Sequence, residues 1–170
     1  ERSVKAAASQ LAAAERLAQQ ASGDNVADSA EITRAYGNLR SLLAALASAK
    51  KALSANHGDW NALDAEADKI AAQGAQVAAA LKGEIAEAQS VVDSISSASA
   101  MVRKAGSWSG SYGVVINGTP GSDSLSQARS LLEAGRYEEA KRAAENAFRK
   151  ASNAIAEAEA EESRQRRAEE

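Results

Sequence analysis

The chain has 170 residues, of which 45% are hydrophobic and 25% are charged, and its formal net charge is −3. It has no cysteine, which excludes disulfide bonds, thiolate catalysis and cysteine-ligated metal sites. No apolar run approaches the roughly 18 residues of a transmembrane helix, and the charge balance gives no basic footprint for nucleic acid.

Alanine makes up about a quarter of the residues, whereas the sequence has only one Phe, two Trp, three Tyr and one Met. Alanine favours helix and buries little area, so the core is expected to be thin and closely packed. This composition predicts an all-α fold, an elongated antiparallel helical bundle of the coiled-coil type.

Two helices are expected before residue 56. The first covers residues 4–22 and ends at the Gly23-Asp24-Asn25 break. The second begins near Asp28 or Ser29, where Asp28 and Glu31 have the spacing of a capping box. Apolar residues then recur in alternating steps of three and four, which is a heptad seam: Ile32, Ala35, Leu39, Leu42, Leu46, Ala49 and Leu53.

The longest predicted element is one central helix over residues 60–105, with Asp59 as its N-cap. Its apolar stripe includes Leu81, Ile85, Val92 and Ser99, so consecutive steps of four around Ile85 predict a stutter. We therefore expect two parts, residues 1–82 and 83–170, that share this helix. The sharing of one helix between successive bundles resembles spectrin repeats in architecture.

Residues 106–121 differ from the rest in composition, because they hold five Gly and the only Pro of the sequence. The β-branched and aromatic run ending at Ile116, followed by the turn dipeptide Asn117-Gly118, predicts a small β-hairpin or a structured loop. Long ordered loops often carry function, which makes this segment a candidate site.

A helical hairpin is expected after the loop. Ser124 and Gln127 have capping-box spacing, Gly135 fits the position after a helix end, and Tyr137 begins the last helix. Beyond Ala158 large apolar residues disappear, so the tail is expected to project as solvated helix or to lead into a further segment. We expect the chain to be a fragment of a larger protein.

Residues 131–148 contain Gly135, Tyr137 and Ala140 at a spacing that resembles the turn between the two helices of a tetratricopeptide repeat. The resemblance implies a contribution to peptide binding. It occurs once, whereas a repeat array needs several units to bury its faces. The alternative is that the motif is simply a good helical-hairpin turn.

Few residues suggest catalytic or cofactor chemistry. His57 is the only His and lies in a polar turn beside Gly58, so no second ligand of its type completes a metal site. The glycine-rich loop leads into a helix but lacks both the P-loop and the dinucleotide-binding motifs. We therefore predict no catalytic residues, no metal and no cofactor.

The function expected from these patterns is that of a non-enzymatic helical scaffold or spacer, with a protein partner or self-association. The alternative is a peptide- or ligand-binding module that uses the loop 106–121 and the turn at 131–148. Its candidate partner-binding residues are Trp108, Tyr112, Ile116 and Tyr137, because large aromatic and aliphatic side chains dominate binding sites. The competing interpretation is that the loop side chains fold back and plug the end of the bundle.

Overall fold

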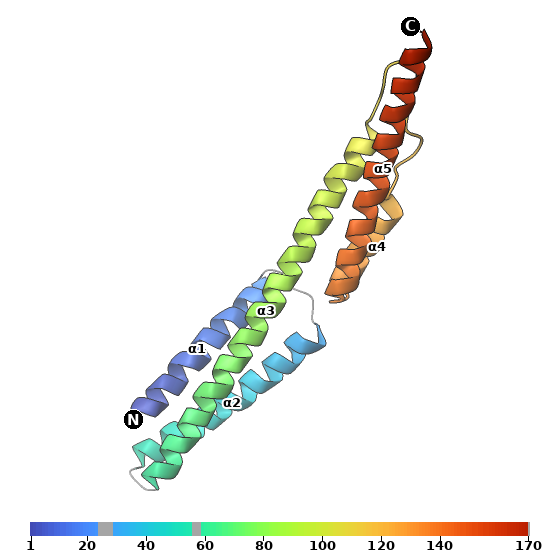
Figure 1. Cartoon of the computed structure of the whole chain (residues 1–170). Helices are drawn as coiled ribbons and strands as arrows, with labels where there is room; N and C mark the ends of the chain where they lie inside the picture. The colour runs from blue at the N-terminus through green and yellow to red at the C-terminus, as the bar shows by residue number, and fades with distance from the viewer. Residues whose placement is uncertain (24–28, 56–58, 170) are drawn as a thin grey trace. The chain divides into compact units, whose positions relative to one another are not determined.

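The structure is a computed structural model that describes residues 1–23, 29–55 and 59–169. Five helices account for its regular structure: α1 (Arg2–Gly23), α2 (Ala30–Ser54), α3 (Trp60–Gly106), α4 (Ser122–Glu133) and α5 (Tyr137–Glu169) (Figure 1). The fold is an all-α helical bundle, as predicted. The expected turns at Asp24-Asn25 and Asn56–Gly58, together with Asp28 and His57, lie outside the described residues.

The chain divides into two compact units, Glu1–Ala86 and Glu87–Glu170. The first contains α1, α2 and the first part of α3, and the second contains the rest of α3 with α4 and α5. Helix α3 thus supplies residues to both units.

The core of the first unit is built from one stripe on each of its three helices. α1 contributes Val4, Ala7, Leu11 and Ala14, while α2 contributes four residues of its seam and α3 contributes Ala67, Ile70, Val77 and Leu81. Gly74 is buried on the same face of α3, where a side chain would press against Leu11. The absence of a side chain at Gly74 therefore lets α1 approach α3 closely.

Helix α2 begins at Ser29, which is both a cap and a buried link to α3. The Ser29 hydroxyl accepts from the backbone N–H of Ile32 (3.1 Å) and donates to Glu84 Oε2 (2.8 Å). Ser29 is only 5% exposed, so these two bonds satisfy a hydroxyl that would otherwise be costly to bury. The same contact holds the Glu84 carboxylate in place on α3.

The apolar stripe of α3 differs from the prediction in its second part. Val91 is 1% exposed and Val92 is 44% exposed, so Val91 belongs to the core and Val92 does not. Buried positions continue at Ala88, Val91, Ile95, Ala98, Val102 and Ala105. The step from Leu81 to Ala88 is one heptad, and the predicted stutter at Ile85 is absent. Glu84 occupies the intervening seam position, which the sequence pattern could not reveal because the residue is charged.

Helices α4 and α5 form the predicted helical hairpin around a glycine turn. Gly135 has φ +69°, and its N–H donates to Leu132 O (3.0 Å) while Arg136 N–H donates to Leu131 O (2.9 Å). This pair of bonds is the Schellman motif, which ends a helix with a left-handed residue. Gly135 is therefore the C′ residue of α4, as predicted.

The start of α4 does not use the expected capping box. The cap residue is Gly121, with φ +90°, and no side-chain hydrogen bond caps the helix. Ser124 lies within the first turn, where its buried hydroxyl accepts from Asn146 (3.3 Å) and Lys150 (3.1 Å) of α5. Packing against α5 therefore took precedence over local capping at this position.

Candidate functional site

The segment between α3 and α4 leaves the end of α3 and returns close to its starting point. A methyl group placed on Gly106 would lie 3.4 Å from Thr119 Cγ2, so the two ends of residues 107–118 are in contact. A compact surface loop whose ends meet has the character of an Ω-loop, a class that is frequently functional.

The loop is organised by a tight turn at Tyr112-Gly113. The N–H of Val114 donates to Ser111 O (3.3 Å), and Gly110 N–H donates to Val114 O (3.2 Å). Both central residues have positive φ, +60° for Tyr112 and +76° for Gly113, which is the pattern of a type I′ hairpin turn. A single antiparallel bridge joins Ser109 to Val115. The turn thus lies at Tyr112-Gly113 and not at the predicted Asn117-Gly118.

Tyr112 is an unusual residue for this turn. Within the described ranges it is the only non-glycine residue with positive φ, a conformation that costs an L-residue about 1–2 kcal/mol. Its side chain is 44% exposed, and Val115 nearby is 59% exposed. The loop therefore holds a strained aromatic residue at its tip in contact with solvent, and such strain concentrates at functional sites.

Trp108 folds back over the loop itself. A side chain on Gly110 would overlap the Trp108 ring, so the indole packs directly on the Gly110 backbone. Trp108, Val114 and Ile116 are half-buried. Trp108 thus packs within the loop, whereas Tyr112 and Val115 are exposed.

A carboxylate of α5 anchors the loop. The backbone N–H of Ser111 donates to Glu162 Oε1 (2.9 Å), and Glu162 Oε2 would lie 3.0 Å from a side chain on Gly110. Because Gly110 has no side chain, both the Trp108 ring and the Glu162 carboxylate can lie against its backbone. The helix was expected beyond Ala158 to project as solvated helix or to lead into a further segment, and the structure adds a contact there, because Glu162 binds the loop.

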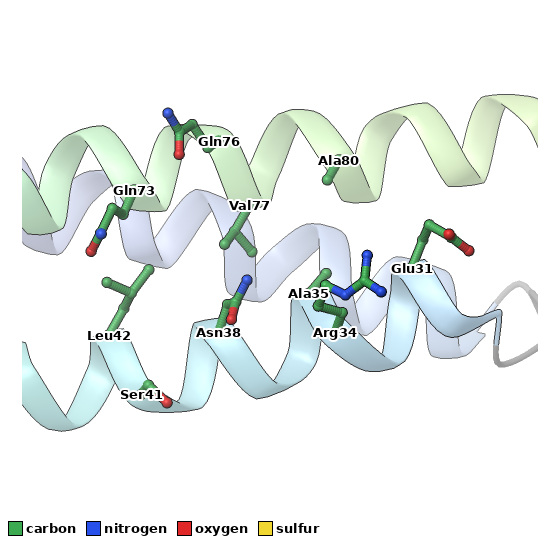
Figure 2. Close-up of a pocket in the computed structure, with 10 residues that line it drawn as sticks. All are labelled: Glu31, Arg34, Ala35, Asn38, Ser41, Leu42, Gln73, Gln76, Val77 and Ala80. Atoms are coloured by element: carbon green, nitrogen blue, oxygen red, sulfur yellow. The ribbon is translucent and has the colours of Figure 1, made fainter.

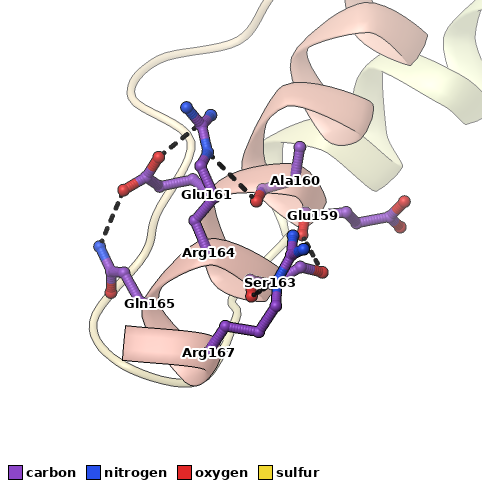
Figure 3. Close-up of polar contacts among 7 residues, drawn as sticks. All are labelled: Glu159, Ala160, Glu161, Ser163, Arg164, Gln165 and Arg167. Atoms are coloured by element: carbon purple, nitrogen blue, oxygen red, sulfur yellow. Dashed lines mark hydrogen bonds and ion pairs between the residues drawn. The ribbon is translucent and has the colours of Figure 1, made fainter. Parts of the chain in front are cut away.

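The surrounding turns of α5 carry a polar network of their own (Figure 3). Arg164 forms an ion pair with Glu161 (3.1 Å), and Gln165 donates to Glu161 Oε1 (3.2 Å). Ser163 donates back to Glu159 O, and Arg167 donates to Ser163 O. These short-range contacts support the helix on either side of Glu162, although surface pairs of this kind each contribute little.

Tyr137 is not part of the loop site. It is 5% exposed at the start of α5, where it belongs to the α4–α5 hairpin. Glu162 lies 25 residues further along the same helix, which is about 37 Å at the rise of an α-helix. The four candidate residues therefore separate into Trp108, Tyr112 and Ile116 in the loop and Tyr137 in the core, and they do not line one groove.

A groove that the sequence did not predict lies between α2 and α3 in the first unit (Figure 2). It has a volume of about 450 Å³, and its apolar floor includes Ala35, Leu42 and Val77. Its polar rim carries Glu31, Arg34, Asn38, Ser41, Gln73 and Gln76. The floor residues belong to the core seams, so no motif marked them as a site.

The described residues show little that could support metal or acid–base chemistry. No group of three or more His, Cys, Asp or Glu residues is placed to hold a metal ion in the described ranges. Ser124 lies beside Lys150, the residue types of a Ser–Lys pair, but Ser124 is only 5% exposed on the face of α4 that packs against α5. Over the described residues no helix is long and apolar enough to span a membrane.

The N-terminus of α4, into which the glycine-rich loop leads, lies against α5. A side chain on Gly121 would overlap the backbone carbonyl of Ala147, so α5 packs directly against this end of the helix. A phosphate group needs open backbone N–H groups at a helix start. The contact with α5 disfavours such a site.

Comparisons of the sequence and the structure with protein-family models, with curated proteins and with solved structures found no match. The turn at residues 131–148 has the geometry of a helical hairpin, and its resemblance to a tetratricopeptide repeat is confined to that turn.

Proposed function

We propose that this protein is a non-enzymatic helical scaffold or spacer domain that mediates protein–protein contact within a larger protein. The observation that carries the proposal is α3, a helix of 47 residues that contributes core positions to both compact units. A helix of this length spans about 70 Å, and its seam keeps one heptad register from Ala67 to Ala105. Long helices that keep one register in this way are typical of elements that set a distance.

The buried groups support the same proposal. Among the described residues, the only buried polar side chains are Ser29 and Ser124, and both are hydrogen-bonded to neighbouring helices. Their bonds hold helices together. Polar residues on the exterior, including the rim of the α2–α3 groove, are then the surface available for protein contact.

The spacer proposal requires α3 to remain one helix in solution. The sequence has no cysteine, so two introduced cysteines can carry spin labels without other changes. Labels at the exposed positions Glu66 and Ser96 are expected to lie about 45 Å apart with a narrow distribution. The control pair, Glu66 and Ala79, lies within the first unit and is expected at about 20 Å.

A broad or short distance for the 66–96 pair, with a narrow control, would show a hinge in α3 and contradict the spacer role. Screening for hydrolase activity and nucleotide binding tests the non-enzymatic part. A reproducible activity that is lost on a single carboxylate or loop substitution would overturn it.

The second candidate is a binding module that uses residues 106–121, with the tetratricopeptide-like turn at 131–148 as a separate contact surface. It is favoured by one observation, the strained and exposed Tyr112 at the loop tip. A rigid aromatic residue among Ser, Gly and Asn is also the composition of adaptable protein-binding loops.

The test of this module uses a photo-crosslinking residue at position 112. If the loop binds a partner, one defined protein is crosslinked, and an excess of the wild-type protein competes for it while the Tyr112→Asn variant does not. Asn tolerates the left-handed conformation, so this variant removes the ring and keeps the turn. Equal competition by both proteins would contradict the module. Trp108→Ala distinguishes the two interpretations of the loop. If Trp108 is a plug, the substitution unfolds the second unit; if Trp108 binds a partner, it weakens binding and leaves the second unit folded.

A further inference from the structure

One motif of the sequence has no role in the observed loop. The hairpin turn is at Tyr112-Gly113, which leaves Asn117-Gly118 in the irregular returning segment of the loop, before Thr119 meets Gly106. Both Asn117 and Gly118 are exposed, and neither lies in a helix or a bridge. We propose that Asn117 is a self-modification site, at which the protein turns its own asparagine into aspartate and isoaspartate through a cyclic imide.

The local structure leaves both reacting groups open. Over the described residues, neither the Asn117 side-chain amide nor the Gly118 backbone N–H has a hydrogen-bond partner. A side chain on Gly118 would meet nothing within 4 Å, and Gly118 has φ +77°. Glycine offers no Cβ to hinder approach of its own nitrogen to the preceding side chain. Nucleophile and electrophile are therefore adjacent, solvated and unhindered.

Other asparagines of the protein provide a contrast. Asn38, Asn61, Asn146 and Asn153 all lie inside helices and are followed by Leu or Ala. For Asn38, Asn146 and Asn153 the next backbone N–H is held by a carbonyl four residues earlier. After Asn61, in the first turn of α3, the N–H of Ala62 donates to Asp59 Oδ1 (3.3 Å). In both cases the attacking nitrogen is held and the backbone cannot turn toward the side chain. Asn117-Gly118 is also the only Asn-Gly pair in the sequence. The proposal therefore names one asparagine and predicts that these four remain unchanged.

The reaction needs only water. The Gly118 backbone nitrogen loses its proton to solvent and attacks Asn117 Cγ, forming a new bond between these two atoms. The bond from Cγ to the amide nitrogen Nδ2 then breaks, and this nitrogen leaves as ammonia after taking up a proton. Water hydrolyses either carbonyl of the five-membered imide, giving aspartate when Cγ is attacked and isoaspartate when the backbone carbonyl of residue 117 is attacked. No oxidation or reduction occurs.

The products change the loop in two ways. Each introduces a carboxylate into residues 106–122, a stretch that carries no charged residue. Isoaspartate also inserts an extra carbon into the backbone, within a loop whose ends are held together at Gly106 and Thr119. The loop surface that includes Tyr112 would therefore alter with the age of the protein.

The test is incubation of the intact folded protein at neutral to mildly alkaline pH in ¹⁸O-water, followed by peptide mass spectrometry. We expect the Asn117 peptide to gain the mass of amide-to-carboxylate conversion with one heavy oxygen, and to separate into aspartate and isoaspartate forms. Peptides containing Asn38, Asn61, Asn146 and Asn153 should not change. Asn117→Gln should lose the conversion, because its longer side chain would have to form a six-membered ring.

A sample of the same protein unfolded in urea serves as the reference for the reactivity of the sequence itself. If Asn117 stays unmodified in the folded protein while the unfolded sample reacts, the loop holds the pair apart and the proposal is overturned. Conversion without isoaspartate would also overturn it, because direct hydrolysis of the amide yields aspartate alone.

Discussion

At the scale of single residues, Gly121 is fixed by two independent constraints. Its φ of +90° is unfavourable for a residue with a side chain, and the position of its Cβ is occupied by the Ala147 carbonyl. An Ala147 with almost no side chain lets α4 begin directly on the backbone of α5. The contact between Gly121 of the α4 cap and Ala147 of α5 thus requires a small residue on each side.

We predict that Gly121→Ala lowers the free energy of unfolding of the second unit by about 3 kcal/mol or more, from backbone strain and displacement of α4. The matched control is Gly113→Ala, which has φ +76° with open space around it and should cost only the backbone strain of about 1–2 kcal/mol. Urea unfolding followed by circular dichroism measures both. Equal effects would mean that the contact with Ala147 contributes nothing.

Glu162 acts at the same scale, as the carboxylate that holds the loop. Glu162→Ala is expected to remove protection from exchange at the Ser111 amide and to cost about 0.5–1.5 kcal/mol. Glu162→Gln keeps a carbonyl oxygen and should retain most of the protection. Hydrogen exchange read by NMR provides the measurement, and Glu161→Ala is the control. Unchanged protection in Glu162→Ala would refute the anchor.

At the scale of elements, the register of α3 is the feature most open to test. Adjacent valines, Val91 and Val92, are equally apolar, and the structure places only Val91 in the core. Glu84 stands at the seam position between Leu81 and Ala88, where the Ser29 hydroxyl donates to its carboxylate. A pattern of apolar residues alone passes over a charged residue and selects the wrong valine.

Val91→Ala is predicted to destabilise the second unit by about 2 kcal/mol, from lost burial and the cavity that remains. Val92→Ala should change the free energy of unfolding by no more than about 0.5 kcal/mol, because the side chain is 44% exposed. Thermal or urea unfolding of the two variants decides between the registers. If Val92→Ala instead lowered the free energy of unfolding more than Val91→Ala, the register with a stutter at Ile85 would be the correct one.

At the scale of the whole molecule, the heptad seam of α2 bears on the state of assembly. Six of its residues are no more than 8% exposed within a single protein molecule: Ile32, Ala35, Leu39, Leu42, Leu46 and Ala49. A seam that is already covered leaves no apolar stripe to drive a coiled coil with a second copy.

We therefore expect a monomer of 17.5 kDa by size-exclusion chromatography with light scattering across a wide range of concentrations. A stable dimer would show that a seam faces another copy, and Leu39, Leu42 and Leu46 would then be the positions to substitute. A monomer directs the search for contacts to the groove rim and the loop.

The sequence by itself determined the helices and their order. Alanine content, heptad spacing and the end signals at Asp59 and Gly135 act within a few residues of each other, so they can be recognised without a structure. The same signals predicted α3 to within one residue of its end and located the irregular loop at residues 106–121.

Only the tertiary structure decided which surfaces these helices present. Three findings depend on contacts between residues far apart in sequence. Val91 is buried, α4 is capped at Gly121 and not at Ser124, and Tyr137 lies in the core and not in the loop site. The turn at Tyr112 had no signal, because a type I′ turn ordinarily selects Gly or Asn at that position. Its anchor is Glu162, 51 residues away, and a bond over that distance leaves no mark in local spacing.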